Sequence, residues 1–264
     1  WFPSVIPELY FEHGIADAVG IGQGELTFDE VVKALDCGEP LDSVPGLALW
    51  RDGKLVYTDH REVVGFEKFA PVPWHLLEYE KYAELQVKPT HMKVRHRFPL
   101  PGKWTVDNPP RAFSHFSSFG CPEPCTFCCS PLITGKRYKA IEGATLAEEI
   151  AELQQRFKFD VLRFQDANWG VAEKRTKAFC EKLIELKVPI HWNGTIEIET
   201  IARYKQDTLD LLRDSKCHLL WLGAEAGTAE MQKRIKKEIA IANIPYSIGE
   251  LYRRNITPGT FWII

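Results

Sequence analysis

The stretch FGCPEPCTFCCSP, residues 119–131, holds four of the seven cysteines of this 264-residue chain. They are Cys121, Cys125, Cys128 and Cys129, and the first three have the spacing C-x3-C-x2-C. A glycine precedes the first cysteine and two prolines lie between the first two, which is typical of a loop rather than of a helix or strand. The density and spacing of the thiols indicate a loop that holds a metal or a metal cluster.

The loop lies near the start of a regular succession of strands and helices. Apolar runs of strand length alternate with segments of helical periodicity, which is the pattern of an α/β protein with a parallel sheet. Parallel sheets carry their sites in the loops after the strands, and the cysteines follow the first strand. We expect strands over residues 112–118, 159–164, 190–194, 217–223 and 257–264, and helices over residues 145–157, 172–187, 207–215 and 228–237.

Several kinds of cysteine chemistry compete for this spacing. A zinc ribbon uses two separated C-x2-C pairs, and no second pair or suitable histidine follows. A redox dithiol needs only Cys125 and Cys128, which leaves Cys121 without a role. Thiolates ligate iron–sulfur clusters, and three thiolates on a four-iron cluster leave one iron open. We therefore predict Cys121, Cys125 and Cys128 as cluster ligands, with Cys129 pointing away; incidental thiols are the alternative.

The chain before the cysteines divides into two regions. Residues 1–60 carry a predicted strand at ADAVGIG, a helix at LTFDEVVKALDCG that ends at Gly38, and a hairpin at GLALWRDGKLVYT. Asp-Gly between two apolar runs is a strong hairpin signal. Residues 61–110 are rich in proline and have little periodicity, so we expect a linker that lies over a surface.

Composition excludes several classes of protein. The net charge is −3 and 45% of the residues are hydrophobic, so nothing in the charge favours a nucleic-acid partner. No apolar run approaches the roughly 18 residues of a membrane span. Cys37, Cys180 and Cys217 stand alone in the sequence. We therefore expect no disulfide framework, and we expect a reducing, cytoplasmic location.

The cysteine stretch resembles a known family. The spacing C-x3-C-x2-C with the aromatic Phe127 before the last cysteine, after a strand and ahead of a βα series, closely resembles the radical S-adenosylmethionine (SAM) enzymes. The resemblance implies a 4Fe–4S cluster on the three cysteines, SAM chelated to its open iron, and cleavage of SAM to a 5′-deoxyadenosyl radical. It also implies that Phe127 contacts SAM and that a reductant such as flavodoxin or ferredoxin is a partner.

The wider sequence is similar to the subclass of these enzymes in which a cobalamin-binding domain precedes the radical domain. FSSFGCPEPCTFCCSPLITGKRY, residues 116–138, carries this likeness, and so does the strand, turn, helix and hairpin order of residues 1–60. The turn is Gly22-Gln23-Gly24-Glu25, so the resemblance implies that Gly22, Gly24 and Glu25 lie at the cobalamin. A glycine turn with a purely structural role is the alternative.

The same resemblance implies contacts to SAM at the ends of later strands. LRFQDANWGVAEKR, residues 162–175, places Asp166 and Asn168 at such a site, and capping of the following helix is the alternative role. LWLGAEAGTAEMQKRIKK, residues 220–237, resembles a G-x-E turn and indicates Glu225, with a cap or salt bridge as the alternative. Glu197 and Glu199 are weaker candidates, to which we do not commit.

The resemblance predicts an α/β protein composed of the C-terminal part of a Rossmann-like cobalamin-binding domain (residues 1–60), a linker (61–110) and a partial (β/α)6 radical SAM barrel (111–264) cut in its fifth strand. Because the apolar run GTFWII ends the sequence, we expect the chain to be part of a longer protein. Cobalamin-dependent methyl transfer to an unactivated carbon of a small molecule is the first expectation. A cobalamin-linked ring closure or rearrangement is the second, and a non-catalytic iron–sulfur or zinc module is an alternative of another class.

Overall fold

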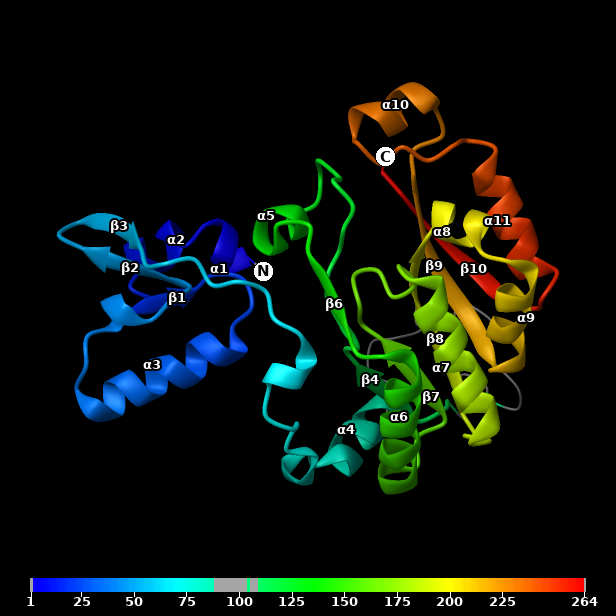
Figure 1. The fold of residues 1–264 in the computed structure, drawn as a ribbon, viewed down its shortest axis with the longest axis horizontal. Coiled ribbons are helices and arrows are strands. Elements are labelled where there is room, and N and C mark those ends of the chain that lie inside the picture. Colours follow the sequence, from blue (N-terminus) through cyan, green and yellow to red (C-terminus); the bar gives the residue numbers. More distant parts are fainter. Residues whose placement is uncertain (1, 88–103, 105–108, 264) are drawn as a thin grey trace. The chain divides into compact units, whose positions relative to one another are not determined.

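The computed structural model describes residues 2–87, 104 and 109–263. The chain forms two compact units. The N-terminal unit consists of Trp1–Pro71 together with Gly120–Lys139, and so includes the cysteine loop. The sheet unit consists of Val72–Phe119 and Ala140–Ile264. Figure 1 shows the helices and strands of each unit.

The N-terminal unit confirms the strand, helix and hairpin expected there. Strands β1 (Ala18–Gly20), β2 (Leu47–Arg51) and β3 (Lys54–Tyr57) form an antiparallel sheet in that order. Asp52 and Gly53 in the hairpin both have positive φ, as a two-residue primed turn requires. Helix α3 (Glu25–Cys37) ends at Gly38 in the left-handed conformation. Shorter helical segments are α1 (Phe2–Val5), α2 (Glu8–Glu12), η1 (Leu41–Ser43), η2 (Phe66–Lys68) and α5 (Ser130–Thr134).

The sheet unit is built on a five-stranded parallel sheet, which confirms the predicted α/β pattern. Each strand pairs with the next one of the series, so the order in the sheet is the order in the chain. In Figure 1 helices α6 and α7 lie in front of the central strands. The strands are β4 (Ala112–His115), β7 (Val161–Phe164), β8 (His191–Glu197), β9 (Cys217–Glu225) and β10 (Thr257–Trp262).

Helices follow the strands and bury one face of the sheet. The buried core joins alternate strand residues such as Leu162, Trp192 and Leu220 to the apolar faces of the helices, as the period of two in a strand requires. No helix in the described part of the chain combines the length and hydrophobicity of a membrane span. The helices are α6 (Gly143–Phe157), α7 (Glu173–Glu185), α8 (Ile198–Arg203), α9 (Gln206–Asp214), α10 (Ala229–Arg234) and α11 (Asn243–Tyr252).

Some elements of the sheet unit differ from the expectation. The strand expected over residues 112–118 is two strands, because β4 ends at His115 and β5 (Ser118–Gly120) pairs with β6 (Tyr138–Ala140) instead. Helices α8 and α11 were not expected. Helix α11 begins with Asn-Ile-Pro, and a proline in the first turn removes no helical hydrogen bond.

The proline-rich segment 61–110 carries more structure than a linker over a surface. It contains the turn η3 (Trp74–Leu76) and helix α4 (Tyr79–Val87). The Tyr79 ring packs on Phe113 and Phe157, and its hydroxyl donates to the Ala112 carbonyl at 3.2 Å. This part of the segment therefore belongs to the core of the sheet unit. The rest of the segment, residues 88–103 and 105–108, lies outside the described residues.

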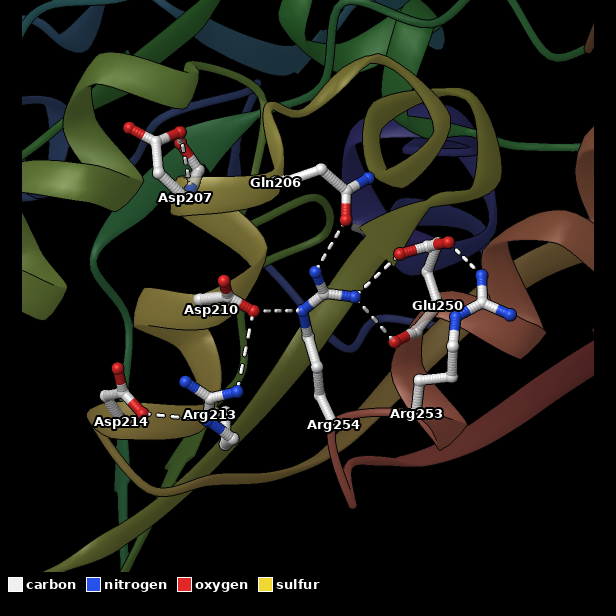
Figure 2. Close-up of polar contacts among 9 residues, drawn as sticks. Gln206, Asp207, Asp210, Arg213, Asp214, Glu250, Arg253 and Arg254 are labelled. Atoms are coloured by element: carbon white, nitrogen blue, oxygen red, sulfur yellow. Dashed lines mark hydrogen bonds and ion pairs between the residues drawn. The ribbon is translucent and has the colours of Figure 1, made fainter.

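A buried arginine joins helices α9 and α11 on the outside of the sheet (Figure 2). Arg254 donates from Nε to Asp210 at 2.8 Å, from Nη1 to Glu250 at 2.6 Å, and from Nη2 to Gln206 at 2.7 Å. Only 9% of its side chain is exposed. Buried charge is tolerated only when it is paired and hydrogen-bonded, so this network requires the two helices to pack together.

Candidate active site

The cysteine loop begins at a glycine that no other residue can replace. Gly120 has φ +82°, and a Cβ there would lie 2.0 Å from the Arg137 carbonyl oxygen. The two arms of the loop approach so closely only because the side chain is absent. The loop ends in helix α5, which begins after Cys129 with Pro131 in its first turn.

The three predicted ligands lie on this loop together with the fourth cysteine. Cys125 is buried, Cys121 and Cys128 are half-buried, and Cys129 is exposed. The sulfur of Cys128 accepts a hydrogen bond from the Ser130 amide at 3.4 Å. Three thiols on one short loop are a donor set suited to an iron–sulfur cluster.

The thiols are not gathered around one point. Within the residues that the structure describes, no three histidine, cysteine, aspartate or glutamate side chains form a group that could hold a metal ion. A four-iron cluster sets a different requirement from a single ion, because each thiolate binds a different iron. Phe127, between the second and third ligands, is 49% exposed, and its contact with SAM stays a prediction.

Asp166 lies directly beyond β7, where the sequence predicts a site, and its carboxylate is already occupied. It is 3% exposed. Its oxygens accept from the Ser117 amide at 3.2 Å, from the Ser117 hydroxyl at 2.9 Å, and from the Ser118 hydroxyl. These bonds neither test nor require a contact with SAM. The alternative role was a cap on helix α7. None of the hydrogen bonds that Asp166 makes to the described residues goes to the start of that helix.

Asn168 has an unused acceptor. It is 1% exposed, and its Oδ1 is buried without a hydrogen-bond partner in the described residues. A buried amide oxygen without a donor costs about 1–3 kcal/mol, so the site fits a ligand that brings one. The contact of Asn168 with SAM stays a prediction.

Glu225 ends β9 in an unusual conformation. Its φ is +59°, in the left-handed region that residues with a Cβ seldom adopt. Its carboxylate folds back over Gly223, where a Cβ would lie 2.6 Å from Oε1 and 2.9 Å from the Lys237 ammonium. A side chain at the glycine of the G-x-E turn would therefore displace the ends of these two charged side chains.

Lys237 joins the ends of two neighbouring strands. Its ammonium lies 2.7 Å from Glu197, at the end of β8, and 3.5 Å from Glu225. All three side chains are largely buried. Two carboxylates from neighbouring strand ends therefore share one ammonium.

Sequence reasoning missed Lys237, Ser117 and Arg175. Arg175 is buried in helix α7 and donates to Ser117 and to the Ile141 and Trp169 carbonyls. No sequence pattern marks it as different from the other charged residues of that helix. The Ser-Ser pair before the cysteine stretch is the only signal at Ser117.

The glycine turn of the N-terminal unit is held by side chains on both sides. Gly22 has φ +83°, and its amide donates to the Ser4 hydroxyl at 3.0 Å. The buried Gln23 side chain exchanges two hydrogen bonds with the Val64 backbone. Gly24 and Glu25 begin helix α3 and are exposed. The turn thus presents Gly24 and Glu25 to solvent, while their contact with cobalamin stays a prediction.

The predicted residues fall into two groups. Asp166, Asn168 and Glu225 follow parallel strands of the sheet unit, at the edge where α/β proteins bind ligands. The cysteine loop and the glycine turn belong to the N-terminal unit. A Cβ on Gly22 would lie 3.4 Å from the Ile133 carbonyl of helix α5, so these two features are neighbours within that unit.

The chain is similar to known enzymes, although no family model matches it. An uncharacterized methyltransferase of Pyrococcus horikoshii is 25% identical over 224 residues, which cover 84% of this chain and 43% of the relative. The anaerobic magnesium-protoporphyrin IX monomethyl ester cyclase of Synechocystis is 24% identical over 247 residues, which cover 94% of this chain and 45% of the relative. The chain thus spans less than half the length of these relatives.

Solved structures share the fold. The cobalamin-dependent SAM radical enzyme OxsB, with aqua-cobalamin bound, matches all of this chain with a TM-score of 0.77 at 17% identity, over 35% of its own length. The radical SAM methyltransferase TsrM of Kitasatospora setae, with cobalamin and a 4Fe–4S cluster bound, matches 98% of this chain with a TM-score of 0.70 at 17% identity, over 47% of its own length. In sequence and fold the chain is thus similar to cobalamin-dependent radical SAM enzymes, and it corresponds to part of their length.

Proposed function

We propose that this chain forms the radical-generating part of a cobalamin-dependent radical SAM methyltransferase that acts on an unactivated carbon of a small molecule. The observation that carries the proposal is the C-x3-C-x2-C loop, which follows β5, the short strand after the first strand β4 of a five-stranded parallel sheet. Asn168 lies beyond the end of β7, and Glu225 ends β9. The methyltransferase relative of Pyrococcus horikoshii supports the reaction class.

Different residues of the chain would bind the cluster and SAM. Cys121, Cys125 and Cys128 would hold a 4Fe–4S cluster through their thiolates. Asn168 would accept a hydrogen bond from the ammonium group of SAM, and Glu225 would offer a carboxylate to its ammonium or ribose hydroxyls. When bound, the cluster would supply the electron that cleaves SAM, and cobalamin would supply the methyl group.

A second reaction has its own support. The cyclase relative covers 94% of this chain, against 84% for the methyltransferase relative. A cobalamin-linked ring closure would use the same cluster and SAM residues, so the two reactions differ in the fate of the substrate. Transfer of label from the methyl group of SAM to product supports methyl transfer, whereas an unlabelled cyclised product supports ring closure.

The decisive experiment is anaerobic reconstitution of the full-length protein with iron and sulfide, followed by a SAM-cleavage assay. We expect about four irons per chain and release of 5′-deoxyadenosine in the presence of a reductant such as flavodoxin. Iron without SAM cleavage would support a non-catalytic iron–sulfur module. Zinc in place of iron would contradict the proposal.

Replacing Glu225 with glutamine should weaken SAM binding and leave the iron content unchanged. Loss of one charged hydrogen bond costs about 1.5–3 kcal/mol, so we expect the dissociation constant of SAM to rise about 10- to 150-fold. The fold should persist because Lys237 keeps its ion pair with Glu197 at 2.7 Å. Calorimetric titration of the reconstituted protein with SAM measures the change.

Glu199→Gln is the matched control for that variant. Glu199 also follows β8, but its carboxylate accepts from the Ala240 amide at 2.8 Å and from the Asn243 side chain at 2.9 Å. It therefore holds the start of helix α11. A SAM affinity that falls equally in both variants would contradict a direct contact of Glu225 with SAM.

Gly24→Leu should lower the cobalamin content of the full-length protein at least about tenfold, the factor that corresponds to about 1.4 kcal/mol. Gly24 has φ −97°, and no atom lies within 4 Å of a Cβ placed there, so a side chain can begin there without a clash, and we expect leucine to obstruct a ligand at the turn. Corrin absorbance after incubation with hydroxocobalamin measures the loss, while the iron–sulfur absorbance should persist. Asp36→Leu, at the exposed far end of helix α3, is the control, and equal corrin loss in both would contradict a contact at Gly24.

A further inference from the structure

Ser117 lies where the chain leaves the sheet, between the end of β4 and the start of β5, and all of its polar groups are bonded. It is completely buried. Its amide and hydroxyl both donate to Asp166. Its carbonyl accepts from the Ile141 amide at 2.9 Å and from Arg175 at 3.3 Å. Four residues further along, the chain reaches Cys121.

The hydroxyl of Ser117 connects a buried cation to a buried anion. Arg175 Nη2 donates to it at 2.7 Å, and it donates to Asp166 Oδ1 at 2.9 Å. The direction of each bond is set, because an arginine can only donate and a carboxylate can only accept. Asp166 also accepts from the neighbouring Ser118 hydroxyl. The same short segment is therefore bound by a positively charged side chain, Arg175, and by a negatively charged one, Asp166.

Arg175 is itself fixed by three other contacts. Its Nε donates to the Ile141 carbonyl at 2.8 Å, and its Nη1 donates to the Trp169 carbonyl at 2.9 Å. Its guanidinium lies 5.3 Å from the centre of the Trp169 ring. Since Ile141 follows β6, which is the strand that returns from the cysteine loop, Arg175 contacts the chain on both sides of that loop. The departing arm is held at Ser117 and the returning arm at Ile141.

We propose that Asp166 and Arg175 form a clamp on Ser117 and Ile141 that holds the two arms of the cysteine loop, and that Asp166 is a positioning residue for the iron–sulfur cluster. The proposal rests on the proposed function for the presence of the cluster. Asp166 Oδ1 accepts from three groups of Ser117 and Ser118, so a SAM ammonium would have to displace bonds that are buried and charge-assisted. Such networks rigidify the backbone they include.

If the clamp is correct, substitutions of Asp166, Ser117 and Arg175 should have different effects. Asp166→Ala removes the acceptor for three donors, and Ser117→Ala removes the hydroxyl that connects the two charges. Arg175→Gln loosens both arms. Asp166→Asn keeps one oxygen that can accept from the serines, so it should restore part of what alanine loses. If Asp166 instead contacted SAM directly, the variants would differ in another order, because Ser117→Ala would leave SAM binding unchanged.

The test measures two properties of the full-length protein. After anaerobic reconstitution, a chelator should remove iron faster from Asp166→Ala, Ser117→Ala and Arg175→Gln than from the wild type. We expect a rate at least about tenfold higher, because loss of one charge-assisted hydrogen bond corresponds to about that factor. Asp166→Asn should lie between alanine and wild type. Hydrogen exchange of the Ser117 and Ser118 amides in the protein without iron should accelerate in the same order. The SAM affinity of the iron-loaded fraction should change less than about threefold.

Arg254→Gln is the matched control, because Arg254 is an equally buried arginine with carboxylate partners on the outside of the sheet (Figure 2). It should lower the melting temperature without changing iron loss or exchange at Ser117. Wild-type iron retention in Asp166→Ala together with a large loss of SAM affinity would overturn the clamp. Unchanged exchange at Ser117 would overturn it as well. A wild-type protein that binds no iron would refute the proposed function, and the exchange measurement would still decide on the clamp.

Discussion

Alanine at Cys121, Cys125 or Cys128 is expected to reduce the iron of the reconstituted full-length protein from about four to below about one per chain, while alanine at Cys129 keeps it. Each predicted ligand would hold one iron of the cluster, and loss of one thiolate exposes the cluster to water. Cys129 is exposed and precedes helix α5, whose first amide already donates to the sulfur of Cys128. We therefore expect Cys129 to stay outside the cluster.

Iron and sulfide analysis, with the visible spectrum of each variant, measures this result. Circular dichroism of the proteins before reconstitution shows whether the fold is kept, which we expect because the four cysteines of the loop form no part of the core of the sheet unit. Equal iron loss in Cys129→Ala would contradict the assignment of three ligands. Iron retained in all three ligand variants would contradict the cluster itself.

Arg254→Ala is expected to lower the free energy of unfolding by about 3 kcal/mol, the lower end of the range for breaking a buried ion pair. The change removes one of the two arginine partners of the buried Glu250, together with the bonds to Asp210 and Gln206 that join helix α9 to α11. Arg253 still contacts Glu250 and limits the loss. The network and its partners are drawn in Figure 2.

Arg253→Ala provides the comparison for this prediction. Its side chain is 62% exposed, and exposed ion pairs contribute about 0–1 kcal/mol. Denaturant unfolding of both variants measures the difference, with the midpoint and the slope read separately. A loss in Arg253→Ala as large as in Arg254→Ala would contradict the view that burial decides the strength of the network.

Local patterns in the sequence were sufficient for the βα series. The strand at residues 159–164 is observed as β7, the helix at residues 145–157 as α6, and the hairpin around Asp52 and Gly53 as β2 and β3. In each case the signal lies within a few residues: a period of two, a helical period, or a turn dipeptide. The parallel order of the strands follows because each helix returns the chain to the same edge of the sheet.

The same patterns did not reveal helix α11 or the part of the proline-rich segment that packs in the core. The prolines in residues 61–110 favoured a linker, because the helical periodicity of α4 extends over few residues. The packing of the Tyr79 ring on Phe113 explains why that helix forms. Helix α11 is favoured by burial of Ile244 and Leu251 and by the ion pairs of Arg254. Tertiary contacts of this kind override weak local preference.

By itself the sequence determined the α/β pattern, the place of the cysteine loop ahead of the βα series, and the three thiols suited to a cluster. The tertiary structure alone decided what the polar residues near that loop contact. Asp166 meets Ser117 across 49 positions, Arg175 meets Ser117 across 58, and Lys237 meets Glu197 across 40. The physical reason is that backbone periodicity is set by neighbours in the chain, whereas a buried charge takes its partner from whichever strand end the fold brings within hydrogen-bond distance.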